Sequence, residues 1–128
     1  MISSLACDFL IRIKNSSLAG SKSLKSPSSK FIVAIADSLK KNGFIDSYSV
    51  SEDKKEITVK LIQTDNISKI TDVALFSKPG RRWYEKSLNL PWGKTPQSLI
   101  IVSTSKGVLS QKEAKKLGLG GEIIAEIY

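Results

Sequence analysis

Three hydroxyl side chains, a cation and a glycine are consecutive at Ser103, Thr104, Ser105, Lys106 and Gly107. Serine and threonine hydroxyls both donate and accept hydrogen bonds, so this group can contact base edges, 2′-hydroxyls and phosphates of a nucleic acid. Gly107 lets the backbone approach a ligand closely. The same residue types are also typical of an ordinary serine-rich strand end, and taken alone they slightly favour that interpretation. A nucleotide phosphate loop is excluded, because the chain lacks the required spacing of glycines before a Lys-Ser or Lys-Thr pair.

A second cluster alternates cations with aromatic rings around a tight turn. Lysine and arginine neutralise phosphates, and an exposed ring can stack on a base or a ribose, so the composition suits a nucleic acid. Pro79 and Gly80 fit the central positions of a type II turn. The alternative, given equal weight, is a solvated turn whose aromatic rings pack inward. The residues of the cluster are Lys78, Arg81, Arg82, Trp83, Tyr84 and Lys86.

Side chains suited to catalysis are few. The chain has one cysteine, Cys7, and no histidine, which removes disulfides and the usual zinc ligand sets. A nucleophilic Ser105 needs a neighbouring base, and Cys7 has no histidine partner, so a small core cysteine is the stronger interpretation. The aspartates are scattered and form no paired-carboxylate or metal pattern. We therefore expect no enzyme, no cofactor and no small-molecule substrate, with a reactive Ser105 or Cys7 as the rival hypothesis.

The charge balance indicates a polyanionic partner. The 128 residues carry 20 Lys and Arg against 12 Asp and Glu, a net charge of +8 that divides evenly between the two halves of the chain. Such a basic folded body favours nucleic acid first and an anionic membrane surface second. The expected helices show only ordinary core patterning, and no apolar run has the length that spans a bilayer. Because Asp8 comes too early for a secretory signal, we expect a soluble intracellular protein without a membrane partner.

The first half of the chain predicts two helices on one face of a small sheet. Leu5, Phe9 and Ile13 recur at helical spacing, and the later strands alternate apolar with polar residues. The expected elements are a helix capped by Ser3 or Ser4, a serine-rich loop over 16–29 with a short strand at 23–25, a helix from a cap at Ser28 or Ser29 to about Lys41, and a hairpin of strands 44–50 and 56–62.

The second half predicts a mainly β unit with one short helix. Ser110 and Glu113 have the spacing of a capping box, which places a helix start directly after the hydroxyl-rich turn. The expected elements are an extended segment over 67–75 ending in the turn at 77–80, a buried strand over 99–102, the short helix ended by glycines, and a last strand over 122–128. The fold class is therefore α+β, with an N-terminal lobe at 1–65 packed against a mainly β C-terminal lobe at 66–128.

The chain resembles the ribosomal protein eight family of the bacterial-type small subunit. The resemblance runs in order from end to end. The strongest match is the run Ser103 to Val108, followed by Lys112-Glu113-Ala114 and Leu119-Gly120-Gly121-Glu122. Further support comes from the run Asp8 to Asn15, from Ser29-Lys30, and from Ser77 to Arg81 with Tyr84. The chain departs from the family pattern in two places. At Ser3-Ser4-Leu5 the family opens its first helix with Asp-Pro. The second departure is over 92–98, so the resemblance does not predict the path of the 87–98 segment.

The resemblance implies a structural protein that grips the central domain of small-subunit ribosomal RNA and binds early in assembly. In the C-terminal lobe the resemblance implies that Ser103, Thr104 and Ser105 make the specific contacts to the RNA, while Lys106 and Gly107 face the RNA backbone. It also implies that Tyr84 packs or stacks near these residues and that Glu122 supports the loop. The cations Lys78, Arg81 and Arg82 join this surface. In the N-terminal lobe it implies contacts to phosphates and riboses from Arg12, Lys14, Asn15, Ser29 and Lys30.

The implied partners are this RNA, neighbouring small-subunit proteins and the protein's own messenger RNA. The implied location is the cytoplasm, in the small ribosomal subunit, with an organellar ribosome left open. The alternative function is generic basic RNA binding, or translational repression, outside the ribosome.

Overall fold

The computed structural model describes residues 4–64, 67–68, 70–78, 80–93 and 97–128. The predicted cap at Ser3, the turn residue Pro79 and the expected lobe boundary at 65–66 lie outside these residues. The elements are α1 (Ser4–Leu18), β1 (Ser23–Pro27), α2 (Lys30–Lys41), β2 (Ile45–Val50), β3 (Glu56–Leu61), β4 (Gln63–Thr64), β5 (Ile67–Ser68), β6 (Val73–Leu75), β7 (Tyr84–Glu85), the 3₁₀ helix η1 (Ser87–Asn89), β8 (Leu99–Thr104), β9 (Gly107–Ser110), α3 (Gln111–Leu117) and β10 (Gly121–Ile127).

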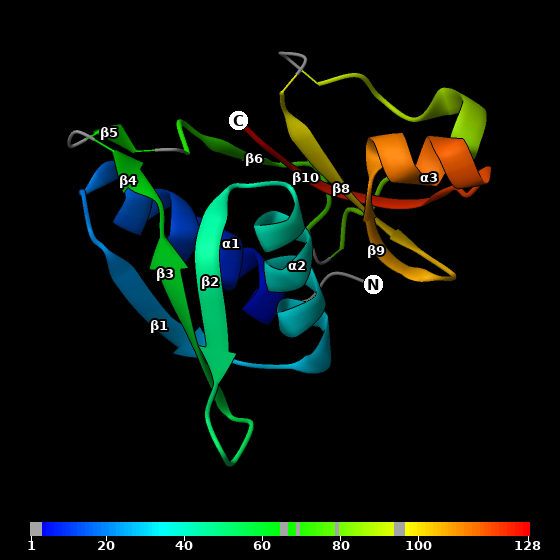
Figure 1. The fold of residues 1–128 in the computed structure, drawn as a ribbon. Coiled ribbons are helices and arrows are strands. Elements are labelled where there is room, and N and C mark those ends of the chain that lie inside the picture. The colour runs from blue at the N-terminus through cyan, green and yellow to red at the C-terminus, as the bar shows by residue number, and fades with distance from the viewer. Residues whose placement is uncertain (1–3, 65–66, 69, 79, 94–96) are drawn as a thin grey trace.

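The expected α+β class is confirmed. Strands β1, β3 and β2 form an antiparallel sheet in that order, and β3 alternates buried apolar residues with more exposed polar ones. Helices α1 and α2 pack against this sheet and contact strands of the C-terminal part on their other side (Figure 1). Ser29 caps α2, because its hydroxyl accepts a hydrogen bond from the Ile32 N–H, as the sequence predicts.

The C-terminal part is built on a second antiparallel sheet. Strands β6, β10, β8 and β9 lie in that order, and β7 pairs with one end of β10. One face carries Val102 and Ile123, which pack with Ala114 of α3 into a hydrophobic cluster of their own. The other face contributes Ile101, Ile124 and neighbouring residues to a core shared with α1, α2 and the first sheet. The two faces of β10 and β8 therefore have different neighbours.

Three expected element boundaries are wrong. Ser16 and Ser17 belong to α1 and not to a loop, because the buried Ser17 hydroxyl donates a hydrogen bond to Ile70 O at 3.3 Å and so gains a partner outside the helix. The segment 67–75 is not one strand, because β5 pairs with β4 while β6 pairs with β10. The residues after Gly107 form strand β9 before α3 begins.

Candidate nucleic-acid interface

The predicted residues of the C-terminal part meet in one row across the sheet. Glu122 of β10 pairs with Ser103 of β8 on one side and with Tyr84 of β7 on the other. Residues directly opposite one another in an antiparallel sheet present their side chains on the same face. Tyr84 is 58% exposed and Glu122 is 2% exposed. The buried carboxylate therefore lies between an exposed ring and a serine hydroxyl.

The hydroxyl-rich turn joins β8 to β9 as a tight hairpin. Thr104 pairs with Gly107, and Ser105 and Lys106 form the exposed turn between them. The Thr104 hydroxyl donates to Gly107 O at 2.8 Å and accepts from the Lys106 N–H at 3.2 Å. Gly107 has a φ of +110°, which a residue with a Cβ adopts only with strain. Thr104 and Gly107 thus shape the turn, and Ser105 presents a hydroxyl that makes no hydrogen bond to the described residues.

The cationic turn is held beside β10 by a buried serine. Lys78 and Arg81 exchange two backbone hydrogen bonds of 2.9 Å. The hydroxyl of Ser77 accepts from the Trp83 N–H at 3.0 Å and donates to Ile123 O at 2.6 Å, so it connects the residue before β7 to β10. Sequence reasoning gave Ser77 no role of its own, because nothing in the residue pattern shows which hydroxyl will be inserted between two strands.

The two aromatic residues after the turn have opposite environments. Trp83 packs edge to face on Phe76, with ring centroids 5.4 Å apart, and its indole Nε1 donates to Glu85 Oε1 at 2.8 Å. The inward-packing alternative is therefore correct for Trp83, whereas Tyr84 is exposed. Arg82 lies beside the row, with its Nε 4.0 Å from Glu122 Oε2. Positive charge and an exposed ring thus border the serine hydroxyls, as a surface that stacks bases and holds phosphates requires.

The predicted cations of α1 do not share one surface. Arg12 Nε pairs with Asp8 at 2.8 Å, and its guanidinium reaches the carbonyl of Lys25 in β1. Lys14 lies on nearly the opposite side of the helix, because each residue advances the helix by about 100°. Its ammonium pairs with Asp72 at 2.9 Å. The exposed Asn15 lies closer to the side of Arg12 than to that of Lys14. Lys14 instead attaches α1 to the C-terminal part.

Ser29 and Lys30 line a hollow at the start of α2. The hollow measures about 660 Å³, and its other walls include Val50 of β2 and Lys54 of the following turn. Lys54 was not among the predicted site residues. Its φ of +60° lies in the left-handed region, and among the described residues it is the one non-glycine residue there. The polar run Glu52 to Lys55 did not predict this backbone conformation. Lys30 and Lys54 together place two cations at this end of the first sheet.

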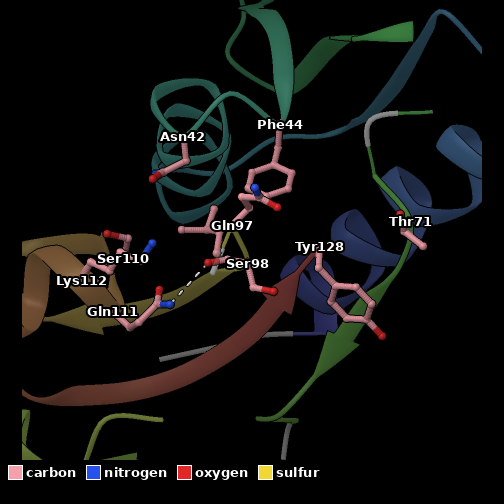
Figure 2. Close-up of a pocket in the computed structure, with 10 residues that line it drawn as sticks. Asn42, Phe44, Thr71, Gln97, Ser98, Ser110, Gln111, Lys112 and Tyr128 are labelled. Atoms are coloured by element: carbon pink, nitrogen blue, oxygen red, sulfur yellow. Dashed lines mark hydrogen bonds between the residues drawn. The ribbon is translucent and has the colours of Figure 1, made fainter. Parts of the chain in front are cut away.

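A second hollow of about 530 Å³ lies where the two parts meet (Figure 2). Gln111 is 3% exposed there, and its amide donates to Ser98 O at 3.4 Å while its oxygen accepts from the Ile100 N–H at 2.8 Å. None of the predicted site residues lines this hollow. Gln111 therefore fixes the start of β8 to α3 and belongs to the architecture that positions the hairpin.

The Lys14–Asp72 attachment predicts a specific acid sensitivity. The hydrogen bond from Lys14, followed by that from the Val73 N–H, lowers the pKa of Asp72 below its ordinary value, and the Tyr128 hydroxyl adds a contact at 3.2 Å. A carboxylate with a lowered pKa stabilises the fold above its ordinary pKa, and this contribution is lost as pH falls through the lowered value.

Thermal unfolding of the parent, Asp72→Asn, Lys14→Gln and the double variant between about pH 6 and pH 2 checks this expectation. Each single variant should show a shallower fall of Tm below about pH 4 than the parent. The double variant should add little to Asp72→Asn, because that change alone already removes the Lys14–Asp72 interaction. Parallel curves for all four proteins would contradict the assignment.

The nucleophile hypothesis finds no support at Cys7. Burial raises the pKa of the Cys7 thiol, and the charge of Lys78 opposes this only in part. The Sγ atom lies 4.0 Å from Ser77 O and packs beside the shared core. At neutral pH the thiol stays protonated and is a poor nucleophile.

No helix in the described residues is long and apolar enough to cross a membrane. A basic α+β body carries a row of serine, carboxylate and tyrosine, an exposed hydroxyl turn and a neighbouring cationic turn. These features are typical of an RNA-binding protein of the α+β class.

Comparisons with known proteins identify the family. The model of the family described as ribosomal protein S8 matches residues 5–128. The chain is 40% identical over 124 residues to the small ribosomal subunit protein uS8 of Hahella chejuensis, with 94% of each chain covered. It is 40% identical over 129 residues to that of Spiroplasma kunkelii, covering 100% of this chain and 99% of the relative. The relative from Corynebacterium efficiens is 39% identical over 124 residues, with 94% of each chain covered. The chain belongs to the ribosomal protein S8 family, whose members are structural RNA-binding proteins and not enzymes.

Proposed function

We propose that the chain is a structural constituent of the small ribosomal subunit that binds the central domain of the small-subunit RNA directly and helps its assembly. The observation that carries the proposal is the row formed by Tyr84, Glu122 and Ser103, which continues into the exposed turn at Ser105. Sequence-specific RNA recognition uses hydrogen bonds to bases and sugars together with stacking on aromatic rings. Family membership supports the same role.

In this proposal the site residues have different tasks. Ser103 and Ser105 contact bases or 2′-hydroxyls, while Thr104 and Gly107 hold the turn in shape. Cations bind phosphates and set the position of the RNA without reading its sequence. In the C-terminal lobe at 66–128 these cations are Lys78, Arg81, Arg82 and Lys106. In the N-terminal lobe at 1–65 they are Arg12 and Lys30, and the uncharged Asn15 and Ser29 contact the RNA beside them.

Two finer points belong to the proposal. The relatives named above are bacterial, which supports a place in the cytoplasmic small subunit of a bacterial-type ribosome. We also include the protein's own messenger as a second RNA, bound through the same row in a structure that resembles the ribosomal site. Competition between a ribosomal RNA fragment and the messenger for the purified protein tests this, and simultaneous binding of both RNAs would exclude it.

Replacing Ser105 with phenylalanine is expected to remove discrimination between cognate and scrambled RNA. The bulky ring blocks the approach to the turn and replaces one hydroxyl, which should weaken cognate binding by about 5- to 150-fold, or ~1–3 kcal/mol on the scale of base readout. Filter binding with a central-domain fragment and a scrambled fragment of equal length measures the ratio. A Ser105→Phe variant that discriminates as well as the parent would show that the turn does not read the RNA.

Arg81→Gln and Lys30→Gln serve as the contrasting variants. Each should weaken cognate and scrambled RNA alike and reduce the slope of log K against log salt by about 0.7 to 0.9 for each lost phosphate contact. Footprinting on naked small-subunit RNA completes the test. Protection of one central-domain helix supports the proposal, and diffuse protection favours a generic basic RNA-binding protein.

A further inference from the structure

Helix α2 ends at the one Asn-Gly pair of the sequence, Asn42-Gly43. In such a pair the backbone nitrogen of the glycine can attack the side-chain amide carbon of the asparagine and close a five-membered succinimide ring. Glycine has no side chain to hinder this approach, and asparagine is among the chemically labile residues. Water then opens the ring to aspartate or isoaspartate. The sequence therefore places a nucleophile and an electrophile side by side at the end of α2.

The backbone at this end of α2 forms a Schellman cap. Gly43 has a φ of +79°, in the left-handed region that the cap requires. Its N–H donates to Lys40 O at 3.1 Å, and the Phe44 N–H donates to Leu39 O at 2.9 Å. Phe44 and Leu39 both belong to the core that the two parts of the chain share. The cap therefore holds the attacking nitrogen in a hydrogen bond, and the core fixes the residue that follows it.

The asparagine is restrained as well. Its Nδ2 donates to Ser38 O at 2.8 Å, so the side-chain amide points back along the helix. The ψ of Asn42 is 6°, which places Gly43 N on the side of the backbone nitrogen of Asn42 and turns it away from Cβ. Ring closure requires a rotation about this bond until Gly43 N faces Cγ. Since that rotation breaks the hydrogen bonds of the cap, the closed cap keeps the two reacting atoms apart.

The pair is exposed to water at the junction of the two parts. Asn42 and Phe44 both line the hollow shown in Figure 2. Leu99 at the start of β8 lines it too, whereas Thr104 of the hydroxyl-rich turn ends the same strand. The exposed end of a helix opens locally at a lower free-energy cost than the whole domain. Local opening of the cap therefore exposes the pair to reaction while the rest of the fold persists.

We propose that Asn42-Gly43 is a site of spontaneous deamidation and that the α2 cap controls its rate. When the cap opens, Gly43 N gives up its proton to solvent and bonds to Asn42 Cγ. The Cγ–Nδ2 bond breaks, and the amide nitrogen takes up a proton and leaves as ammonia. Water then adds to a succinimide carbonyl and breaks a C–N bond of the ring. The net reaction consumes water and releases ammonia, so it needs no oxidant, reductant or enzyme.

The products cannot rebuild the cap. A carboxylate at position 42 has no N–H to donate to Ser38 O, and its negative charge at the C-terminal end of a helix opposes the helix dipole. Isoaspartate also adds a methylene to the backbone directly before Gly43, which displaces Phe44 from the core. Deamidation therefore weakens the junction of the two parts. This inference is independent of the proposed function, because neither Asn42 nor Gly43 has a task in RNA binding.

Two rates measured at the same atom test the inference. The full-length protein is incubated at one mildly alkaline pH in native buffer and in concentrated urea, and aspartate and isoaspartate at position 42 are measured by peptide mapping with mass spectrometry. Hydrogen exchange of the Gly43 N–H, followed by NMR in the native buffer, reports opening of the cap. We expect native deamidation to be about tenfold or more slower than in urea, and to be slowed by the same factor as hydrogen exchange within about threefold.

Three results would overturn the inference. The absence of product at position 42 in urea would exclude the site. Equal deamidation rates in native buffer and in urea, or native deamidation much faster than the exchange protection allows, would exclude control by the cap. Asn89 is an internal control, because it is exposed but precedes the bulky Leu90 and should react more slowly than Asn42 in urea.

Two variants complete the test. Asn42→Gln keeps an amide at the cap but would need a six-membered ring, so the product at this position should disappear. Phe44→Leu keeps the Asn-Gly pair and loosens the core beneath the cap, so it should speed native deamidation and Gly43 exchange by the same factor and leave the rate in urea unchanged. Faster exchange without faster deamidation in Phe44→Leu would contradict control by the cap.

Discussion

Replacing Gly121 with alanine should destabilise the C-terminal sheet and weaken specific RNA binding together. A Cβ atom at Gly121 would overlap the carbonyl oxygen of Ser103 and lie 2.9 Å from its carbonyl carbon. Both obstacles are backbone atoms of β8, so no side-chain rotation relieves the clash. We expect the free energy of unfolding to fall by about 3 kcal/mol or more, since overpacking against backbone is among the costly classes of substitution.

The RNA result follows from the same geometry. Separating β10 from β8 at this point displaces Ser103 from Glu122, so cognate affinity should fall by about tenfold or more even where the variant remains folded. Urea unfolding and fragment binding measure the two effects. Gly20→Ala is the matched control, because Gly20 has a φ of +77° with no atom within 4 Å of an added Cβ, and only about 1 kcal/mol of strain is expected. Equal destabilisation by the two variants would contradict the close-approach explanation.

Replacing Ser77 with alanine should release the cationic turn from β10. The Ser77 hydroxyl connects the Trp83 N–H to Ile123 O, and the residue is fully buried. Alanine leaves a backbone donor and acceptor without this bridge, which should lower the free energy of unfolding by about 2 to 3 kcal/mol. Because Arg81 and Arg82 lie on the released turn, RNA binding should also weaken, with a shallower salt dependence.

Ser38→Ala provides the control for Ser77. Ser38 is 5% exposed within α2, and its hydroxyl makes no hydrogen bond to the described residues. Alanine favours a helix, so this variant should be as stable as the parent or slightly more stable. Hydrogen exchange of the Trp83 amide, followed by NMR, gives a local readout. Unchanged protection of that amide in Ser77→Ala would show that the hydroxyl bridge does not hold the turn.

Local features of the sequence determined much of the fold. The caps at Ser29 and Ser110 each accept an N–H of their own helix, and Gly118 ends α3 with a φ of +69°. These interactions join residues a few positions apart, so the residue types and their spacing are sufficient to predict them. The alternation of β3 and the apolar run of β8 likewise predicted strands, because burial on one or two faces selects those patterns.

Only the tertiary structure decided how the candidate site is assembled. The row of Tyr84, Glu122 and Ser103 depends on the register of three strands that are distant in the chain, and the family resemblance, not the local pattern, first grouped them. Lys14 pairs with Asp72, which is far along the sequence, and this contact attaches α1 to the C-terminal part.

The same holds for the two tryptophans. Trp83 and Trp92 have the same side chain, yet the first packs against the hydrophobic cluster that includes Val102 and Ile123, while the second is exposed beneath the Lys115 ammonium. Exposure and pairing of this kind result from contacts between residues far apart in the chain. Spacing along the sequence does not encode such contacts, whereas it does encode the caps, turns and strand patterns that bring the residues together.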